Sequence, residues 1–482
     1  MAPSPTGLLH IGNVRTAIFD WLLARHHGGQ FVLRVEDTDR TRLVPGSVEA
    51  MMDTLRWIGL EWDEGPEIGG PFGPYVQSER TELYRDHAER LVSNNTAYRC
   101  YCTAERLAAL RAEQERKHQP TGYDRHCRFM SAEERAEQEA SGDPSVIRFA
   151  VPLEGETHLT DALRGVLTYK HETVQDFVLL KSDGFPTYHF AVVIDDHLMQ
   201  ISHVVRGPEY LSTGARDTLL HQALGWPQPE YVHGSEILAP DRKRLAKRHG
   251  ATAVLEFREM GFVPEALFNF LALLGAAYSG DREIFSREEL VAIFDVDKLH
   301  PTPAIFDRTK LEWMNGHYIN HILTLSDVTD RCAPYLERAG LLSGEPTREY
   351  VAAVIALVKD RVKLLPEVVE LTDFFFREPE PSAAEVAGKK LTPEGAHHAI
   401  QTAHKRLEGL DEWDEAAMES RMRQLAEQLD LKAGVLFAAL RIAITGKTVA
   451  PGLFDTMRVL GRERTLERLT RAAETVAAAP IA

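Results

Sequence analysis

The segment that decides the fold stands near the start of the chain and reads Ala2-Pro3-Ser4-Pro5-Thr6-Gly7-Leu8-Leu9-His10-Ile11-Gly12-Asn13. Its two prolines and its first glycine predict a rigid turn that prevents an early helix start. A helix is expected to begin near His10 and to run to about His26. Its free N–H groups and positive dipole end would form a phosphate site, with His10 and Asn13 on one helical face. Gly12 has no side chain and would let a base or ribose lie close to the backbone.

The segments that follow indicate an α/β half. A double glycine ends the predicted helix, and residues 31–35 read as a short strand, an order that suits a doubly wound parallel sheet. Residues 80–175 mix helical runs with short strand patterns and are interpreted as an insertion in that sheet domain. Strand-like runs return at residues 177–180 and 192–194.

The second half of the chain has a helical pattern. After about residue 250 apolar residues recur at helical spacing, and the segment beyond Pro381 is rich in Ala and Glu with a period of 3.6 residues. The expected fold is therefore an α/β Rossmann-type front half with an insertion, followed by an all-α back half.

Composition bounds the function classes. The formal net charge of −17 argues against a protein that coats nucleic acid non-specifically, although five basic residues between 242 and 248 form a local patch. No stretch reaches the ~20 apolar residues of a membrane span, and the start of the chain does not have the pattern of a signal peptide. Four cysteines are too few for a disulfide framework, so a reducing cytosol is expected.

The basic patch contains a second motif, Arg-Leu-Ala-Lys-Arg at residues 244–248. A mobile basic loop can clamp a triphosphate and stabilise charge as pyrophosphate leaves. Together with the first motif, and in this order, it resembles the two signatures of class I aminoacyl-tRNA synthetases, H-I-G-H and K-M-S-K-S. Within that class the chain resembles the bacterial-type glutamyl-tRNA synthetases over essentially its whole length. The segments that carry the resemblance are residues 2–7, 33–40, 185–191, 195–197, 205–207, 247–251, 264–267 and 452–454.

This resemblance implies ATP-dependent activation of L-glutamate and its transfer to the 3′ end of tRNA(Glu). It implies a cytoplasmic monomer, with Mg²⁺ held on the triphosphate rather than in a protein cage. The implied domains are the first catalytic half at 1–80, an inserted acceptor-binding domain at 81–184, the second catalytic half at 185–240, a stem-contact region with the signature loop at 241–320, and α-helical anticodon-binding domains at 321–378 and 379–482.

The resemblance also implies roles for individual residues. Those expected in catalysis are His10, Asn13 and Lys247. Those expected to bind ATP are His10, Gly12, Lys247 and Arg248. Those expected to bind the amino acid are Ala2, Ser4, Glu36, Tyr188 and Arg206. Arg206 can make two parallel hydrogen bonds to the side-chain carboxylate of glutamate, and Tyr188 can add a phenol donor. Glu36 can accept hydrogen bonds from the ammonium group of glutamate. Arg361, in the helical half, is a candidate for anticodon discrimination, with a solvated helix face as the alternative.

The chain departs from the family pattern at both ends of the site. Arg244 stands for the first Lys of the second signature and Ala246 for its Ser, which removes a hydroxyl donor near phosphate. Relatives place a strand ending in a substrate-binding Arg before the first motif, whereas Met1 directly precedes Ala2 here. Either the start is placed too late or one carboxylate contact is missing.

Three cysteines, Cys100, Cys102 and Cys127, resemble a zinc site of some relatives. The histidine that often completes that site in relatives corresponds to Phe129 here. Tyr123 or His126 would complete a tetrahedral set with three thiolates, which suits Zn²⁺. The alternative is a group of reduced thiols without metal.

Three other functions stay open at the level of sequence. A non-discriminating relative would also load tRNA(Gln). A small-molecule adenylyltransferase with the same nucleotide site would not need the all-α half, and a tRNA-binding paralogue would lack catalysis.

Overall fold

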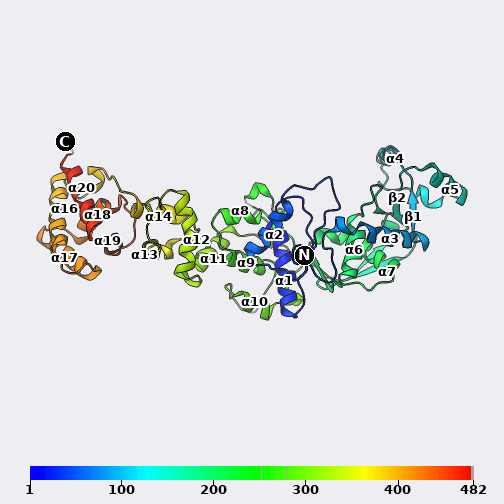
Figure 1. The fold of residues 1–482 in the computed structure, drawn as a ribbon, viewed down its shortest axis with the longest axis horizontal. Helices are drawn as coiled ribbons and strands as arrows, with labels where there is room; N and C mark the ends of the chain where they lie inside the picture. Colours follow the sequence, from blue (N-terminus) through cyan, green and yellow to red (C-terminus); the bar gives the residue numbers. More distant parts are fainter. Residues whose placement is uncertain (251, 279, 479–482) are drawn as a thin grey trace. The chain divides into compact units, whose positions relative to one another are not determined.

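The chain folds into two compact units (Figure 1). The computed structural model describes residues 1–250, 252–278 and 280–478, apart from the side chain of Lys247. The first unit consists of Met1–Glu259 and Pro264–Arg308, and the second of Met260–Val263 and Thr309–Ala482. The first unit is mixed α/β, and the elements described for the second are helical, so the expected α/β-then-α order is confirmed.

The helices of the first unit are α1 (Ile11–His26), α2 (Ser47–Ile58), α3 (Thr81–Ser93), α4 (Ala104–Arg116), α5 (Ala132–Ser141), α6 (Tyr188–Leu198), α7 (Gly214–Leu224), α8 (Val254–Glu259), α9 (Pro264–Leu273) and α10 (Arg287–Ile293). The strands are β1 (Ala97–Cys100), β2 (Val146–Phe149), β3 (Glu156–Asp161), β4 (Gly165–Lys170), β5 (Val178–Leu180), β6 (His203–Arg206), β7 (Glu230–His233), β8 (Ile237–Leu238) and β9 (Ala304–Ile305).

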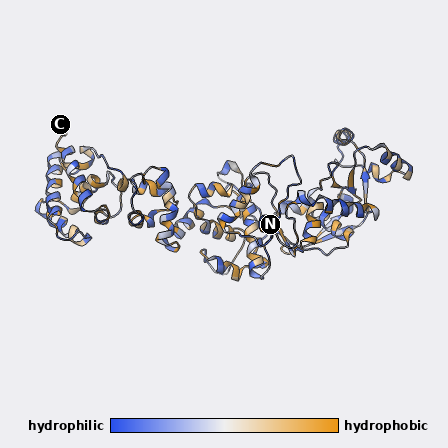
Figure 2. Cartoon of the chain, viewed as in Figure 1, coloured by the Kyte–Doolittle hydropathy of each residue, from blue (hydrophilic) through white to orange (hydrophobic). Residues whose placement is uncertain are grey.

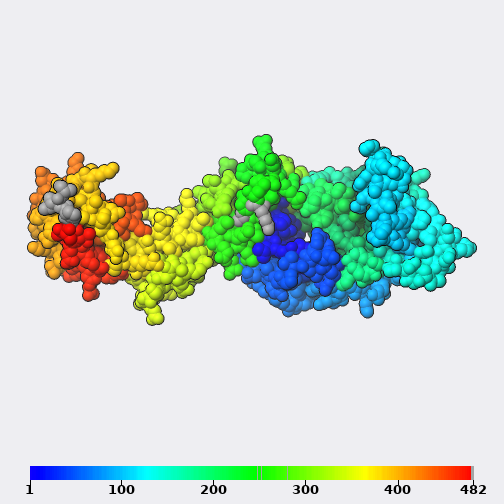
Figure 3. Space-filling view, turned by 90° about the horizontal axis from the view of Figure 1, so that it is seen from above, coloured from blue at the N-terminus to red at the C-terminus, as the bar shows by residue number. Residues whose placement is uncertain are grey.

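The helix α1 begins and ends where the sequence predicted. Its residues Val14, Ala17, Ile18 and Leu22 are fully buried, since α9 and α10 pack against it. The segment before it pairs with the chain near residue 253, through the bridge between His10 and Ala253. Figure 3 shows this N-terminal segment, in dark blue, beside the green region near residue 250. Two segments far apart in sequence therefore meet at the start of α1.

Two of the predicted strands differ from the structure. Residues 31–35 form two isolated parallel bridges, Val32 with Glu64 and Val35 with Val76, instead of a continuous strand. The strand predicted at residues 192–194 is wrong, because these residues lie inside α6. A short β-branched run that is buried on every side reads the same in a helix as in a strand. The predicted strand at 177–180 is confirmed as β5.

Three sheets are assigned among the described residues of the first unit. Strands β1, β2 and β5 form an antiparallel sheet within the region predicted as an insertion. A second sheet has the order β4-β3-β7-β6, in which β7 runs parallel to both β3 and β6. Since the carboxyl ends of parallel strands meet at one edge, the ends of β3, β6 and β7 are neighbours. The third sheet is the short pair β8-β9.

The second unit is built from α12 (Leu325–Arg338), α13 (Arg348–Ala356), α14 (Glu367–Phe376), α15 (Ala383–Ala387), α16 (Pro393–Glu408), α17 (Glu415–Gln428), α18 (Ala433–Thr445), α19 (Leu453–Leu460) and α20 (Arg462–Ala477), while α11 (Arg308–His317) begins at the unit boundary. Figure 2 shows hydrophobic and hydrophilic residues interleaved along these helices. Their apolar faces form one core, in which Ile400, Met418, Leu440 and Leu469 are fully buried. None of the described helices combines the length and apolar character that crossing a membrane requires.

Candidate functional site

A cavity of about 730 Å³ lies in the first unit at the N-terminal end of α1. Its walls come from the turn before α1, the extended segment at residues 32–36, α6, β6 with the turn after it, and parts of residues 235–256. Of the residues that the sequence proposed for the site, the structure brings together Ala2, His10, Gly12, Asn13, Glu36, Tyr188 and Arg206 in this lining.

His10 is the N-cap of α1 and one half of a capping box. Its Nδ1 accepts the N–H of Gly12 at 3.0 Å, and Oδ1 of Asn13 accepts the N–H of His10 at 3.4 Å. Because Nδ1 is an acceptor, the ring proton resides on Nε2. Desolvation, followed by the charge of Arg244, lowers the pKa of His10 and keeps the ring neutral. The cavity is therefore lined by an uncharged imidazole whose remaining nitrogen is a donor.

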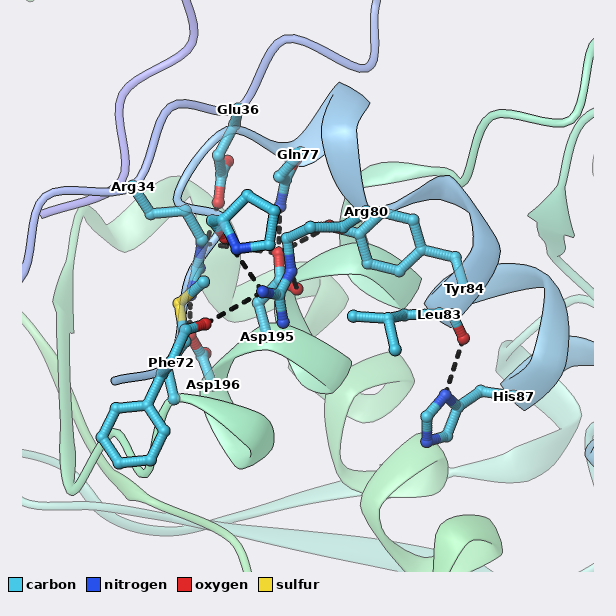
Figure 4. A network of polar contacts seen from close by, with 12 residues as sticks. Arg34, Glu36, Phe72, Gln77, Arg80, Leu83, Tyr84, His87, Asp195 and Asp196 are labelled. Carbon is cyan, nitrogen blue, oxygen red and sulfur yellow. Dashed lines mark hydrogen bonds and ion pairs between the residues drawn. The ribbon is translucent and has the colours of Figure 1, made fainter. Parts of the chain in front are cut away.

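Glu36 belongs to a buried ion cluster (Figure 4). Nη2 of Arg34 lies 3.1 Å from Oε1 of Glu36, and Nη1 of Arg34 donates to Oδ1 of Asp196 at 2.7 Å. Burial raises the pKa of Glu36 to about 7, although the charge of Arg34 opposes the shift. Glu36 thus lines the cavity as a carboxyl group that titrates near neutral pH.

Asp195 extends the cluster to the segment at the start of α3 (Figure 4). Its carboxylate accepts hydrogen bonds from Nε of Arg80 at 2.8 Å, from Nε2 of Gln77 at 2.9 Å and from the hydroxyl of Tyr84 at 2.8 Å. The side chain of Asp195 is fully buried. These bonds join α6 to residues 77–84, where the region predicted as an insertion begins.

Arg206 ends β6 and lies between aromatic rings, with its guanidinium carbon 5.0 Å from the Tyr210 ring centre and 4.9 Å from that of Tyr231. Tyr210 also stacks on Tyr188, with ring centres 5.3 Å apart. Burial, followed by the negative charge of Glu36, raises the pKa of Tyr188, so the phenol stays protonated and is a donor. The wall opposite α1 thus offers a guanidinium beside a phenol.

The signature loop borders the same cavity. Arg244 and Ala246 line it, and Nε of Arg244 lies 3.7 Å from a carboxylate oxygen of Glu236. Arg248 is exposed, does not belong to the lining, and directs its Nε to the His249 ring at 3.2 Å. The side chain of Lys247, which the sequence proposed for catalysis and ATP binding, lies outside the described residues, as does Ala251 of the same motif.

Two other proposed residues lie away from the lining. Ser4 is exposed and is not part of the cavity wall, although its neighbours Ala2 and Pro3 are. Arg361 belongs to the second unit, where it is exposed and donates from Nη1 to the carbonyl oxygen of Ala450 at 3.1 Å.

The predicted metal ligands form a cluster at the end of β1. The Sγ atoms of Cys100, Cys102 and Cys127 lie within 4.8 Å of one another. The hydroxyl of Tyr123 lies 3.3 Å from Sγ of Cys100 and 3.7 Å from Sγ of Cys102, so its oxygen lies beside the three sulfur atoms as a fourth possible ligand. Hydrogen bonds from Cys127 and Tyr123 lower the pKa of Cys100 and favour its thiolate. The His126 ring does not join the donor group found among the described residues.

Several functional groups escaped the sequence interpretation. Arg34, Asp195 and Asp196 stand within the quoted motifs, but nothing in the sequence alone assigned them to one cluster. Asp217 and His233, which contact Arg206, lie outside those motifs. Asp217 is an acidic residue among the buried residues of α7, and nothing in the quoted motifs pointed to it.

Comparison with known proteins agrees with this architecture. A family described as "tRNA synthetases class I (E and Q), catalytic domain" matches residues 1–313, and one described as "Anticodon binding domain" matches residues 327–473. The chain thus contains the catalytic domain of a class I tRNA synthetase, followed by an anticodon-binding domain. The anticodon-binding match favours this class over a small-molecule adenylyltransferase.

The relatives narrow the family further. The chain is 48% identical over 474 residues to the glutamate–tRNA ligase of Dehalococcoides mccartyi, covering 98% of this chain and 96% of that protein. It is 46% identical over 475 residues to the ligase of Moorella thermoacetica, with 98% and 97% covered. A crystal structure of a glutamate tRNA ligase from Elizabethkingia meningosepticum, in complex with its amino acid, matches with a TM-score of 0.91 at 35% identity and covers 98% of both chains. The chain belongs to the glutamate–tRNA ligase family.

The raised pKa of Glu36 generates a pH prediction. An ammonium group binds to the ionised carboxylate, and the pKa of about 7 means that protonation removes this form as the pH falls. The Michaelis constant for glutamate should therefore rise about fivefold between about pH 7 and pH 6 and level off above about pH 8. Steady-state charging assays across this range measure it, with the Michaelis constant for ATP as the control. A flat glutamate constant would place Glu36 outside amino-acid binding.

A second prediction concerns Gly12. A Cβ added there would lie 2.7 Å from Cε1 of His10, so Gly12→Ala should turn the imidazole away and break its cap. The expected loss is roughly 1 kcal/mol of stability and up to about 10²-fold in adenylation rate, because a misplaced group costs that much. Thermal unfolding and ATP–pyrophosphate exchange with tRNA present measure both.

The matched control for this variant is Gly434→Ala, which adds the same methyl group to α18 where no atom lies within 4 Å. The control should leave adenylation unchanged. Wild-type exchange rates in Gly12→Ala would contradict the requirement for the His10 ring position.

Proposed function

We propose that this protein activates L-glutamate with ATP and transfers it to the 3′ end of tRNA(Glu), as a monomer in the cytoplasm. The observation that carries the proposal is a single cavity that three functional groups line. They are the neutral imidazole of His10, which caps α1, the buried guanidinium of Arg206 and the buried carboxyl group of Glu36.

The amino acid is recognised by its charges in this proposal. L-Glutamate carries two carboxylates and one ammonium group. Arg206 binds the side-chain carboxylate, since a guanidinium makes two parallel hydrogen bonds to it, and Tyr188 adds a phenol donor. Glu36 accepts the ammonium. Ala2 contributes to the wall and Ser4 to its rim, where the amino-acid backbone would lie.

ATP is placed at the start of α1. Its phosphates lie at the positive end of that helix and are attracted by the helix dipole, since the N–H groups of Ile11 and Gly12 already bond to Thr252 and His10. Its base or ribose lies against Gly12, and His10 and Asn13 contact the nucleotide. Lys247 and Arg248 of the signature loop approach the triphosphate. Mg²⁺ neutralises charge on the phosphates when bound. We expect this metal to be held mainly by the nucleotide rather than by a protein cage.

The reaction then needs positioning more than covalent chemistry. The α-carboxylate oxygen of glutamate attacks the α-phosphorus of ATP, and the bond to pyrophosphate breaks. The terminal ribose hydroxyl of tRNA next attacks the carbonyl carbon of the mixed anhydride, and AMP leaves. His10 and Lys247 stabilise charge that develops on the phosphate oxygens, as preorganised donors do in phosphoryl transfer.

The remaining segments are assigned to tRNA. We place acceptor-end binding in residues 81–184, stem contacts in 241–320, and anticodon binding in 321–378 and 379–482, with the catalytic halves at 1–80 and 185–240. Arg361 is proposed to discriminate the anticodon. The match of the anticodon-binding family to residues 327–473 supports this assignment of the second unit.

A zinc ion is proposed at the cysteine cluster, held by Cys100, Cys102, Cys127 and the phenol oxygen of Tyr123. Three thiolates and one oxygen suit tetrahedral Zn²⁺, and the convergence of the sulfur atoms within 4.8 Å supports the proposal. When bound, the ion would tie the end of β1 to the segment at residues 123–127.

Charging assays test the main function. Glutamate, ATP and separate transcripts of tRNA(Glu) and tRNA(Gln) should give glutamyl ester on tRNA(Glu) alone, measured by acid precipitation of labelled amino acid. Absence of charging on both transcripts overturns the proposal. Comparable charging of both overturns the restriction to tRNA(Glu) and makes the protein a non-discriminating ligase.

Elemental analysis of the purified protein tests the zinc proposal. We expect about one zinc per chain, since one tetrahedral site is formed, and its loss in Cys100→Ser and Cys127→Ser. Cys332→Ser is the matched control, because this buried thiol lies in α12, outside the cluster. Metal-free protein with full charging activity would refute the site.

A further inference from the structure

Arg206 is held on three sides. Its Nε donates to Nε2 of His233 at 2.9 Å, its Nη2 lies 2.8 Å from Oδ2 of Asp217, and its guanidinium carbon lies 5.0 and 4.9 Å from the ring centres of Tyr210 and Tyr231. Its residue is 7% exposed. Nη1 and Nη2 are both buried without a hydrogen bond in the described part of the chain, although Nη2 forms the ion pair with Asp217 and the residue lines the cavity. A buried donor without a hydrogen bond is costly, so these two nitrogens form the edge that a carboxylate ligand would satisfy.

The contact with His233 depends on one tautomer of its ring. Nε2 can accept from Arg206 only when it carries no proton, so the ring proton must be on Nδ1. That nitrogen lies 2.7 Å from Oδ2 of Asp161, which is a pure acceptor when ionised. Burial lowers the pKa of His233 and keeps the ring neutral. Asp161 therefore selects the tautomer that His233 presents to Arg206.

Asp161 is itself held by the backbone. Its carboxylate accepts the N–H groups of Leu163, Arg164 and His233 at 3.1, 2.9 and 2.9 Å. Although burial alone would raise its pKa, the hydrogen bonds from His233 hold the pKa of Asp161 below its ordinary value. The acceptor for the imidazole is thus an ionised carboxylate with little freedom to move.

The third side of Arg206 is held from two helices. Asp217 on α7 directs Oδ2 to Arg206 and places Oδ1 2.6 Å from Nδ1 of His189 on α6. One carboxylate oxygen thus bonds to His189, and the other forms the ion pair with Arg206. Burial alone would raise the pKa of Asp217, but the bond with His189 and the charge of Arg206 lower it. Asp217 is fully buried and carries the charge that fixes Nη2.

The sheet brings these groups to one edge. Arg206 and His233 are paired residues at the ends of the parallel strands β6 and β7, and Asp161 ends the neighbouring strand β3. Neither His233 nor Asp217 belongs to the cavity lining, so neither reaches a ligand there. They act on the ligand only through Arg206.

We propose that His233, with its tautomer set by Asp161, and Asp217 are positioning residues that fix the plane of the Arg206 guanidinium toward the side-chain carboxylate of glutamate. This inference rests on the proposed function, in which Arg206 binds that carboxylate. The reason is geometric: a fork of parallel N–H bonds tolerates only about 10–20° of misorientation, and a free arginine side chain has several rotatable bonds.

Two substitutions of His233 test the roles of its two ring nitrogens separately. His233→Asn places an amide nitrogen near the former Nδ1 and keeps the bond to Asp161, but it removes the acceptor for Arg206. His233→Gln places an amide oxygen near the former Nε2 and keeps that acceptor. We expect His233→Asn to raise the Michaelis constant for glutamate by about 10- to 100-fold, with the ATP constant and melting temperature near wild type. His233→Gln should recover most of the loss.

The same substitution in an Arg206→Lys background shows whether it acts through Arg206. Lysine has no Nε–H directed at His233, so adding His233→Asn should change the glutamate constant no further. An unchanged constant in His233→Asn alone, or the same increase in both backgrounds, overturns the inference. If His233→Asn does not fold, Asp217→Asn decides: it removes the charge beside Nη2, and an unchanged glutamate constant contradicts the proposal.

These outcomes are distinct from failure of the proposed function. A wild-type protein that does not charge tRNA with glutamate refutes the function itself. A wild-type protein that charges tRNA normally, together with variants whose glutamate constants are unaffected, refutes only the positioning roles.

Discussion

The first unit depends on a buried cluster of charges around Arg34. One guanidinium contacts Glu36, Asp195 and Asp196, whose side chains are each no more than 5% exposed. Removing an ion from water costs several kcal/mol, and only close partners of opposite charge offset it. The extended segment at residues 32–36 and α6 must therefore meet. Arg80 forms a buried ion pair with Asp195, so the start of α3 must also lie against α6. The cluster thus joins parts of the chain on both sides of the inserted segment.

The same cluster explains the chemistry expected of Glu36. Two guanidinium groups, from Arg34 and Arg80, face three carboxylates, so the cluster holds one more acid than base. Burial raises the pKa of Glu36 to about 7, against the opposing charge of Arg34. A ligand ammonium beside it would complete the charge balance. A group that supports the fold in this way is also suited to select a cationic part of the substrate.

Other groups of the cavity, Arg206 and His10, are held in fixed orientations by neighbouring residues. Arg206 is placed by strand pairing, held by the neutral imidazole of His233, and paired with the ionised Asp217. His10 at the start of α1 is likewise used as a cap, which fixes its tautomer. None of these groups forms a covalent bond in the proposed reaction. Catalysis of this type comes from groups that are already oriented before charge develops. A hydrogen bond to one nitrogen of a histidine ring orients the ring and sets the role of its other nitrogen.

The sequence by itself determined the local and the chemical parts of this protein. Proline, glycine and a capping histidine specify where α1 starts, because they act through the backbone of neighbouring residues, and helical periodicity marks the all-α second unit. The motifs indicated the protein family and contained most of the residues that line the cavity. Short apolar runs carried less information. Residues 192–194 belong to a helix, and the sequence did not reveal this because a run that is buried on all sides has no alternation of polar and apolar residues. Only the tertiary structure decided that Asp161, His233 and Arg206 form one chain of hydrogen bonds, that Tyr123 and not His126 joins the three thiols, and that Glu36 titrates near neutrality. Each of these depends on the distance between residues far apart in sequence and on their removal from water, and neither quantity is written in the order of the residues.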